Sequence, residues 1–163
     1  MSLDQHHYAA TVTWTGNRGT GTSSYRDYGR DHDIEFAGLP TLKGSADPTF
    51  RGDPHRYNPE QLLLAALAQC HMLSYLHVAA QNGVVVTAYS DRAEGVMRLN
   101  RDGSGEFTSV TLHPQVSVAD PAHAEIAQSL HTRANQLCFI ARSVNFPVHH
   151  EPTTDVASAP VQG

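Results

Sequence analysis

Two cysteines, Cys70 and Cys138, have the most distinctive side-chain chemistry in this chain of 163 residues. They lie far apart in the sequence, which fits neither a disulfide framework nor the close-spaced pairs of a zinc site. In a reducing compartment they are either two buried thiols or one redox couple. The apolar run LLLAALAQC that ends at Cys70 by itself favours a core thiol, because free cysteine is among the most buried residue types.

The position of Cys138 favours reactivity instead. It follows Leu137 and is expected to begin a short helix that ends near Asn145. Unpaired N–H groups and the helix dipole at a helix start stabilise a thiolate, which is the nucleophilic form of cysteine.

Charged residues precede the apolar run: Arg51 and Arg56 in a predicted loop, and Glu60 in the first turn of a predicted helix. An arginine can lower a thiol pKa, bind a carboxylate and orient an oxygen substrate. The alternatives are two solvated loop arginines and a glutamate that only complements the helix dipole.

Ten helical residues separate Glu60 from Cys70, which corresponds to about 15 Å along the axis and roughly 80° around it. Glu60 therefore cannot contact Cys70 of its own chain. If the two cooperate, the carboxylate must come from a second copy, so this hypothesis predicts a dimer.

The elements that must position these residues follow from the sequence pattern. Alternation and turn residues predict a β-meander in the first third, with strands in YAATVTWTG, GTGTSSYRD and HDIEFAG, and then an ordered loop over residues 39–57. Asn58, Pro59 and Gln61 form a capping pattern that begins a helix, and Asn82-Gly83 ends it near Gln81. This helix is apolar nearly all round, which predicts that it is central or covered by a second subunit.

The second half of the chain predicts a long hairpin and a second helix. Two alternating strands are joined by RDGSG, and Asp120-Pro121 caps the helix that follows. Strands do not alternate singly with helices, so we expect an α+β fold with an antiparallel sheet. We expect one domain over residues 1–152 and a flexible tail over 153–163.

Composition excludes several classes of function. The net charge is -5 and Lys43 is the only lysine, which argues against nucleic acid or an anionic membrane as partner. No secretory signal is visible, so we expect a cytoplasmic protein. The most apolar run, residues 62–68, is too short to span a bilayer. The histidines show no zinc-binding signature or helical metal-pair spacing, and a metal site assembled from distant residues has a low prior.

Three segments together resemble the OsmC family of osmotically inducible and organic hydroperoxide resistance proteins: NPEQLLLAALAQC, the cysteine in ANQLCFIARSVNFPV, and the approach GSADPTFRGDPHRYNPEQL. The resemblance spans roughly residues 8–150. It implies an OsmC-like fold, with a buried central helix and a second helix, that forms an intertwined homodimer with both active sites at the interface.

The resemblance also implies a thiol peroxidase that works without metal or organic cofactor. Cys70 then attacks the peroxide bond and becomes a sulfenic acid, Cys138 resolves it as a disulfide, and Glu60 pairs with an arginine that helps activate the thiolate. Arg51 best fits the arginine of the OsmC branch, whereas Arg18 resembles that of the hydroperoxide resistance branch. Many members have Cys-Pro-Val at the second cysteine, where this chain has Cys-Phe-Ile.

An apolar surface around the thiol favours organic, fatty-acid-like hydroperoxides as substrates, because burial of each CH₂ contributes about 0.8 kcal/mol. Turnover then needs an external dithiol, which in relatives is often a lipoylated protein. Two alternatives stay open: a non-catalytic stress protein that binds a lipid-like ligand on the same fold, and a metal-binding protein that uses the histidines.

Overall fold

The computed structural model describes residues 4–157, and these form two compact units. The boundary between the units falls between Leu62 and Leu63, inside the first long helix. The single domain expected over residues 1–152 stays a prediction.

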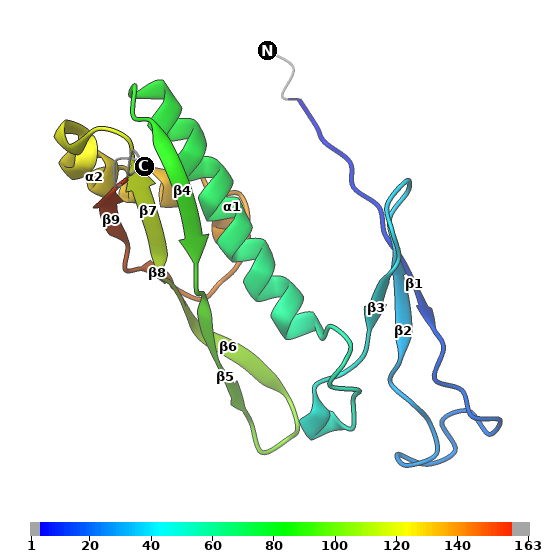
Figure 1. Cartoon of the computed structure of the whole chain (residues 1–163). Coiled ribbons are helices and arrows are strands. Elements are labelled where there is room, and N and C mark those ends of the chain that lie inside the picture. Colours follow the sequence, from blue (N-terminus) through cyan, green and yellow to red (C-terminus); the bar gives the residue numbers. More distant parts are fainter. Residues whose placement is uncertain (1–3, 158–163) are drawn as a thin grey trace, which may run out of the picture. The chain divides into compact units, whose positions relative to one another are not determined.

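The first unit contains a three-stranded antiparallel sheet in the order β1-β2-β3 (blue to cyan in Figure 1). Its strands are β1 (Thr11–Trp14), β2 (His32–Glu35) and β3 (Leu42–Gly44). The expected strand in GTGTSSYRD is instead a series of turns. The Asn17 side chain accepts hydrogen bonds from the N–H groups of Gly19 and Gly21, and such local bonds compete with a strand ladder.

The predicted loop over residues 39–57 is more regular than expected. Residues 39–57 contain β3 and a 3-10 turn, Pro48–Phe50. The Asp47 side chain caps this turn by accepting from the N–H of Thr49 at 2.8 Å.

The first long helix, α1 (Pro59–Gln81), has the predicted bounds. Asn58 Oδ1 accepts from the N–H of Gln61 at 2.8 Å, and Gln61 Oε1 accepts from the N–H of Asn58 at 3.1 Å. These reciprocal bonds are the predicted capping box. Gly83, which follows the helix, has a φ of 69°, a conformation that glycine adopts without strain.

Burial of α1 is one-sided within a single chain. Its fully buried side chains lie on one stripe: Leu67, His71, Tyr75, Val78 and Ala79. Leu73, on another face, keeps 60% of its surface exposed. The all-round burial that the sequence predicts is therefore not reached within one chain.

By length and composition alone α1 could cross a bilayer, with a mean hydropathy of 1.5 in its most apolar window, so the expectation of too short a run was wrong. The same test is passed by core helices of globular proteins. Here the Tyr75 hydroxyl donates to the carbonyl of Ala127 at 3.1 Å and ties α1 to the second helix, as in a core helix.

The predicted long hairpin is broken into two pairs of strands in different sheets. Strands β4 (Val86–Asp91) and β5 (Glu94–Leu99) replace its first strand, and β6 (Gly105–Leu112) and β7 (Pro114–Val118) replace its second. The N–H of His113 donates to Asp91 Oδ1 at 2.8 Å, a hydrogen bond at the break that lies outside the strand ladder.

The two resulting sheets have the orders β4-β7-β9 and β5-β6-β8. Strands β8 (Val148–His150) and β9 (Thr153–Val156) pair in parallel with β6 and β7. The fold class is therefore α+β as predicted, with mixed rather than purely antiparallel sheets. Strand β9 lies in the segment expected to be a flexible tail, and residues 158–163 lie outside the described residues.

The second helix, α2 (Ala124–Leu137), follows a 3-10 turn, Pro121–His123, that the Asp120 side chain caps. Helix α1 runs along β4 and β7 with α2 near β9 (Figure 1). One core cluster joins α1, β7 and α2 through Tyr75, Val116 and Leu130, and the other joins α1 and β6 through Leu67 and Leu112.

Three histidines lie within this core. His71 Nε2 and His131 Nδ1 are 3.0 Å apart, and the His131 ring stacks on Tyr75 with a centroid distance of 4.0 Å. His150 packs beside both rings. Burial lowers the pKa of His71 to about 4 and that of His131 to about 3, so both are neutral at pH 7.

We expect acid to destabilise this fold well above the pKa of its carboxylates. Below pH 6.5 the unfolded chain binds protons that the buried His71 and His131 do not, so stability falls until the pH reaches about 4. Each group contributes a loss of about 1.4 kcal/mol per pH unit in that window. His131→Phe should remove about that much of the slope in urea unfolding between pH 6 and 5. Leu130→Ala, a core substitution in the same helix that removes no titratable group, should lower stability at every pH and leave the slope unchanged.

Candidate active site

Cys70 lies in the middle of α1, half-buried, and its side chain lines a pocket of about 380 Å³. The pocket is lined by residues of α1 and of the segment where α2 ends: Cys70, Leu73, Ser74, His77, Leu137 and Phe139. The lining is mostly apolar, with Phe139 79% exposed at its edge. A small organic molecule can therefore reach the Cys70 sulfur from this pocket.

Cys138 is the C-cap of α2 and does not begin a helix, so the predicted helix start was wrong. Its backbone is extended, and the next helical turn is only the 3-10 turn Ala141–Ser143. The predicted contact between a backbone N–H and the sulfur is nevertheless present, because the N–H of Ala141 donates to the Cys138 sulfur at 3.4 Å.

Burial dominates the ionisation of Cys138, of which only 1% is exposed. Burial raises the pKa of its thiol to about 11, against the opposing effect of the Ala141 hydrogen bond. The nearby Cys70 thiol adds to this rise, and the residues on both sides of Cys138, Leu137 and Phe139, line the same pocket as Cys70. The structure therefore brings the two predicted cysteines together, with Cys138 protonated and hidden from solvent.

Arg51 is exposed and has an unusual backbone conformation. Its φ of 67° is the only positive φ of a non-glycine residue among residues 4–157. This left-handed conformation at the end of the Pro48–Phe50 turn costs about 1 to 2 kcal/mol relative to an ordinary one. Arg18, the alternative arginine, lies in an exposed turn of the first unit.

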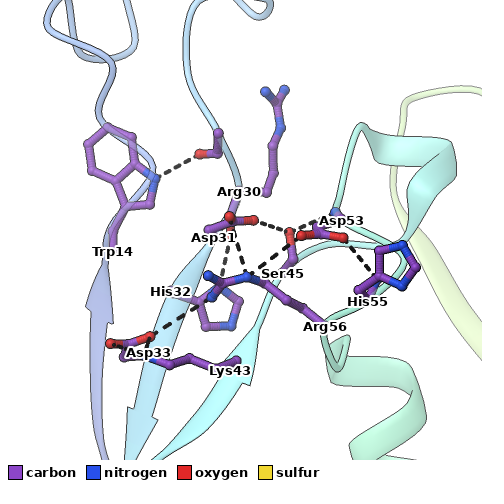
Figure 2. A network of polar contacts seen from close by, with 11 residues as sticks. Trp14, Arg30, Asp31, His32, Asp33, Lys43, Ser45, Asp53, His55 and Arg56 are labelled. Atoms are coloured by element: carbon purple, nitrogen blue, oxygen red, sulfur yellow. Dashed lines mark hydrogen bonds and ion pairs between the residues drawn. The ribbon is translucent and has the colours of Figure 1, made fainter.

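Arg56 is held in a polar network of the first unit (Figure 2). Its guanidinium lies 3.4 Å from Asp31, 3.8 Å from Asp53 and 3.9 Å from Asp33. The fully buried Ser45 hydroxyl donates to Asp31 at 2.9 Å and accepts from the N–H of Asp53 at 3.1 Å. Sequence reasoning missed these aspartates, which give Arg56 a structural role in joining β2 to the loop before α1.

Glu60 lies in the first turn of α1, and the helix is continuous from Glu60 to Cys70. The separation of about 15 Å expected from helix geometry therefore applies within one chain. Glu60 also complements the dipole at this helix start.

Two polar residues of the pocket, Ser74 and His77, were missed as site residues. The signal was available, because they follow Cys70 by four and seven positions and so share its side of a helix. His77 was considered only in relation to His71, whose ring instead faces the core.

The geometry does not assemble a metal centre in the part of the chain that the structure describes. No three His, Cys, Asp or Glu side chains among residues 4–157 lie where they could hold a metal ion together. The His71–His131–His150 cluster is a packed set of rings.

Comparison with known proteins places this chain in a family. A family model for OsmC-like proteins matches residues 52–153, more than half of the chain. The chain belongs to the OsmC-like family. The match covers α1, both cysteines and the strands from β4 to β8, so this OsmC-like protein has the fold that its motifs predict.

Solved structures support the assignment over nearly the whole length. An OsmC-like protein of unknown function from Vibrio cholerae is 32% identical, with a TM-score of 0.79 over 91% of this chain and 99% of that one. An organic hydroperoxide resistance protein from Legionella pneumophila is 19% identical, with a TM-score of 0.69 over 94% and 100%. At that identity the second likeness establishes the fold alone.

A curated relative is equally uninformative about activity. The uncharacterised protein YmaD of Bacillus subtilis is 23% identical over 145 residues, which are 87% of this chain and 89% of YmaD. The family relation thus supports a redox or peroxide-related stress function for this OsmC-like protein without fixing its substrate.

The difference in exposure predicts unequal alkylation of the two thiols. We expect iodoacetamide to modify Cys70 in the folded protein, and Cys138 only after unfolding, because one sulfur lines the pocket and the other is buried. Peptide mass spectrometry of labelled wild type and Cys70→Ser measures both sites. Faster labelling of Cys138 than of Cys70 in folded wild type would contradict the assignment.

Proposed function

We propose that this protein is a cysteine-based thiol peroxidase that reduces organic, fatty-acid-like hydroperoxides to alcohols. The observation that carries the proposal is the arrangement of the thiols: Cys70 lines an apolar pocket, and Cys138 lies buried beside it. The Cys70 thiol is accessible to a substrate from the pocket, whereas the Cys138 thiol is shielded from solvent and lies near Cys70. The names of the hydroperoxide resistance proteins from Legionella pneumophila and Elizabethkingia anophelis that share this fold support the same chemistry.

The proposed reaction has three steps. The Cys70 thiolate attacks the terminal peroxide oxygen, the O–O bond breaks, and the alkoxide takes a proton to give the alcohol and a Cys70 sulfenic acid. The Cys138 thiol then displaces the hydroxyl from the Cys70 sulfur, which gives a disulfide and water. An external dithiol reduces this disulfide and is itself oxidised to a disulfide.

The high pKa of Cys138 keeps this thiol out of the first step, and its proton must leave as it attacks the Cys70 sulfur, because the thiolate is the nucleophile. A thiol that stays protonated does not compete for peroxide, and it is adjacent when the sulfenic acid forms. The reductant fits the class of exposed dithiols, to which lipoylated proteins belong, and we place the cycle in the cytoplasm, where reduced thiols are maintained.

The active assembly is an intertwined homodimer. Apolar surface of α1, including Leu73, stays exposed in one chain and is available to a second copy. The same assembly would supply Glu60 of the second copy to Cys70, which Glu60 of the same chain cannot reach along α1. Glu60 would then position an arginine that stabilises the thiolate.

Arg51 is the arginine that we assign to this role. The left-handed backbone of Arg51 supports this assignment, because strained non-glycine residues cluster at functional sites. Arg56, by contrast, is already neutralised by the three aspartates around it.

The cycle is tested by counting free thiols during a titration with cumene hydroperoxide. We expect wild type to lose two thiols and 2 Da at about one equivalent of peroxide, as disulfide formation requires. Cys138→Ser should accumulate a sulfenic acid at Cys70, trapped with dimedone, and Cys70→Ser should consume no peroxide.

Persistence of both thiols in excess peroxide would reject the peroxidase. The alternative function, binding of a lipid-like ligand without catalysis, would then be favoured, because the pocket beside Cys70 is mostly apolar. Retention of a fluorescent fatty acid by Cys70→Ser as by wild type would support it.

Arg51→Gly separates function from stability. Glycine adopts the observed φ without strain, so the free energy of unfolding should stay within about 1 kcal/mol of wild type or rise. If Arg51 stabilises the thiolate, kcat/KM for cumene hydroperoxide should fall about 10²-fold. Arg18→Gly is the matched control and should retain activity. Full activity of Arg51→Gly would reject this arginine, and a loss confined to Arg18→Gly would assign its role to Arg18.

A further inference from the structure

Polar groups join α1 to α2 at two successive helical turns inside the second unit. The Tyr75 hydroxyl donates to the carbonyl of Ala127 at 3.1 Å. One turn further along each helix, His71 Nε2 lies 3.0 Å from His131 Nδ1. All four residues are buried. Because the contacts move back along α1 and forward along α2, the two helices run in opposite directions at this point.

The two imidazole rings are joined by a hydrogen bond and are not stacked face to face. Their centroids are 5.3 Å apart and their planes differ by 12°, which together with the short distance between the nitrogens places the rings end to end in nearly one plane. One neutral ring then donates its N–H and the other accepts through a lone pair. Such a bond permits only a narrow range of distances and angles, whereas apolar side chains can slide past one another. The pair therefore fixes His71 of α1 against His131 of α2.

The remaining nitrogens of this pair are a burden on the core. Within residues 4–157, His71 Nδ1 and His131 Nε2 are buried and have no hydrogen-bond partner. Burial of a polar atom without a partner is unfavourable. Replacement of both partners of a buried hydrogen bond by apolar groups of the same shape can leave stability unchanged or raise it. Packing alone therefore does not account for two histidines at this position.

Each histidine shares its helix with one of the two cysteines. Cys70 directly precedes His71 on α1, and Cys138 follows His131 by two helical turns, at the end of α2. Ala134, which lies between them on α2, is buried, as are His131 and Cys138, so these three follow one buried side of the helix. A shift or rotation of α2 against α1 at the histidines would therefore move the Cys138 sulfur away from Cys70.

We propose that His71 and His131 are positioning residues, whose hydrogen bond holds α1 and α2 where the Cys138 thiol can reach the Cys70 sulfur. This proposal rests on the proposed function for its use in the protein, because it serves the step in which Cys138 resolves the Cys70 sulfenic acid. The histidines act through the helices and not on either sulfur. Loss of one such hydrogen bond corresponds to about a tenfold lower effective concentration of one thiol at the other.

The test measures the equilibrium of the two thiols with glutathione disulfide, in which one protein disulfide and two glutathione thiols form for each glutathione disulfide consumed. We expect His71→Leu to lower this equilibrium constant about tenfold, which raises the reduction potential of the Cys70–Cys138 pair by about 30 mV. His71→Gln, whose amide can replace Nε2 in the hydrogen bond, should restore most of the wild-type constant. Val116→Ala, a change in the same core that removes no contact between the helices, should lower stability and leave the constant unchanged.

A double variant separates positioning from stability. With His71→Leu and His131→Leu combined, the free energy of unfolding should equal or exceed that of wild type, because both polar groups are removed together. The equilibrium constant should still fall about tenfold. A wild-type constant in this variant would overturn the proposal, as would equal losses in Val116→Ala and His71→Leu. The comparison of His71→Leu with His71→Gln decides the same question in variants that keep His131.

This equilibrium involves no peroxide, so it is independent of the proposed function. A wild-type constant in His71→Leu would overturn the positioning role even where cumene hydroperoxide is consumed. A wild-type disulfide that joins two chains on a non-reducing gel would overturn it as well, because the histidines pack within one chain. A lowered constant in His71→Leu, with no peroxide consumed by wild type, would reject the peroxidase and leave the positioning of the thiols standing.

Discussion

The packing of one face of α1 into the core is the constraint on which the rest of this site depends. Leu67, His71 and Tyr75 fix the rotation of the helix against the sheets and α2. Because successive helical residues turn by about 100°, that rotation directs Cys70 and His77 away from the buried stripe and into a pocket. The Cys70 thiol is therefore accessible from the pocket because the opposite side of the helix is packed into the core.

The same packing creates a chemical difference between two identical side chains. Cys138 ends α2 beneath this surface, where burial keeps its thiol protonated, while Cys70 lines the pocket. One sulfur can meet a hydroperoxide and the other is next to it, as a two-step thiol cycle requires. The buried histidines serve the packing: they stay neutral, and they link α1, α2 and β8 through ring contacts.

Local signals predicted α1 well and the sheets poorly. The capping box at Asn58 and the Asn82-Gly83 stop act within a few residues, so the sequence contains them in full. The break between β6 and β7 depends on pairing with strands far along the chain, and no local pattern encodes that choice. The cap position of Cys138 was misjudged for a similar reason, because the end of α2 and the following turn depend on tertiary packing.

The sequence by itself determined the family, the fold class, the limits of α1 and the two cysteines, because these depend on motifs and on helix periodicity. Only the tertiary structure decided that the cysteines are neighbours, that Cys138 is the hidden one, and that Ser74 and His77 share the pocket of Cys70. It also separated Arg51, strained and exposed, from Arg56, which is held by aspartates. Burial and proximity arise from contacts between segments distant in the chain, and those contacts set which side chains can react.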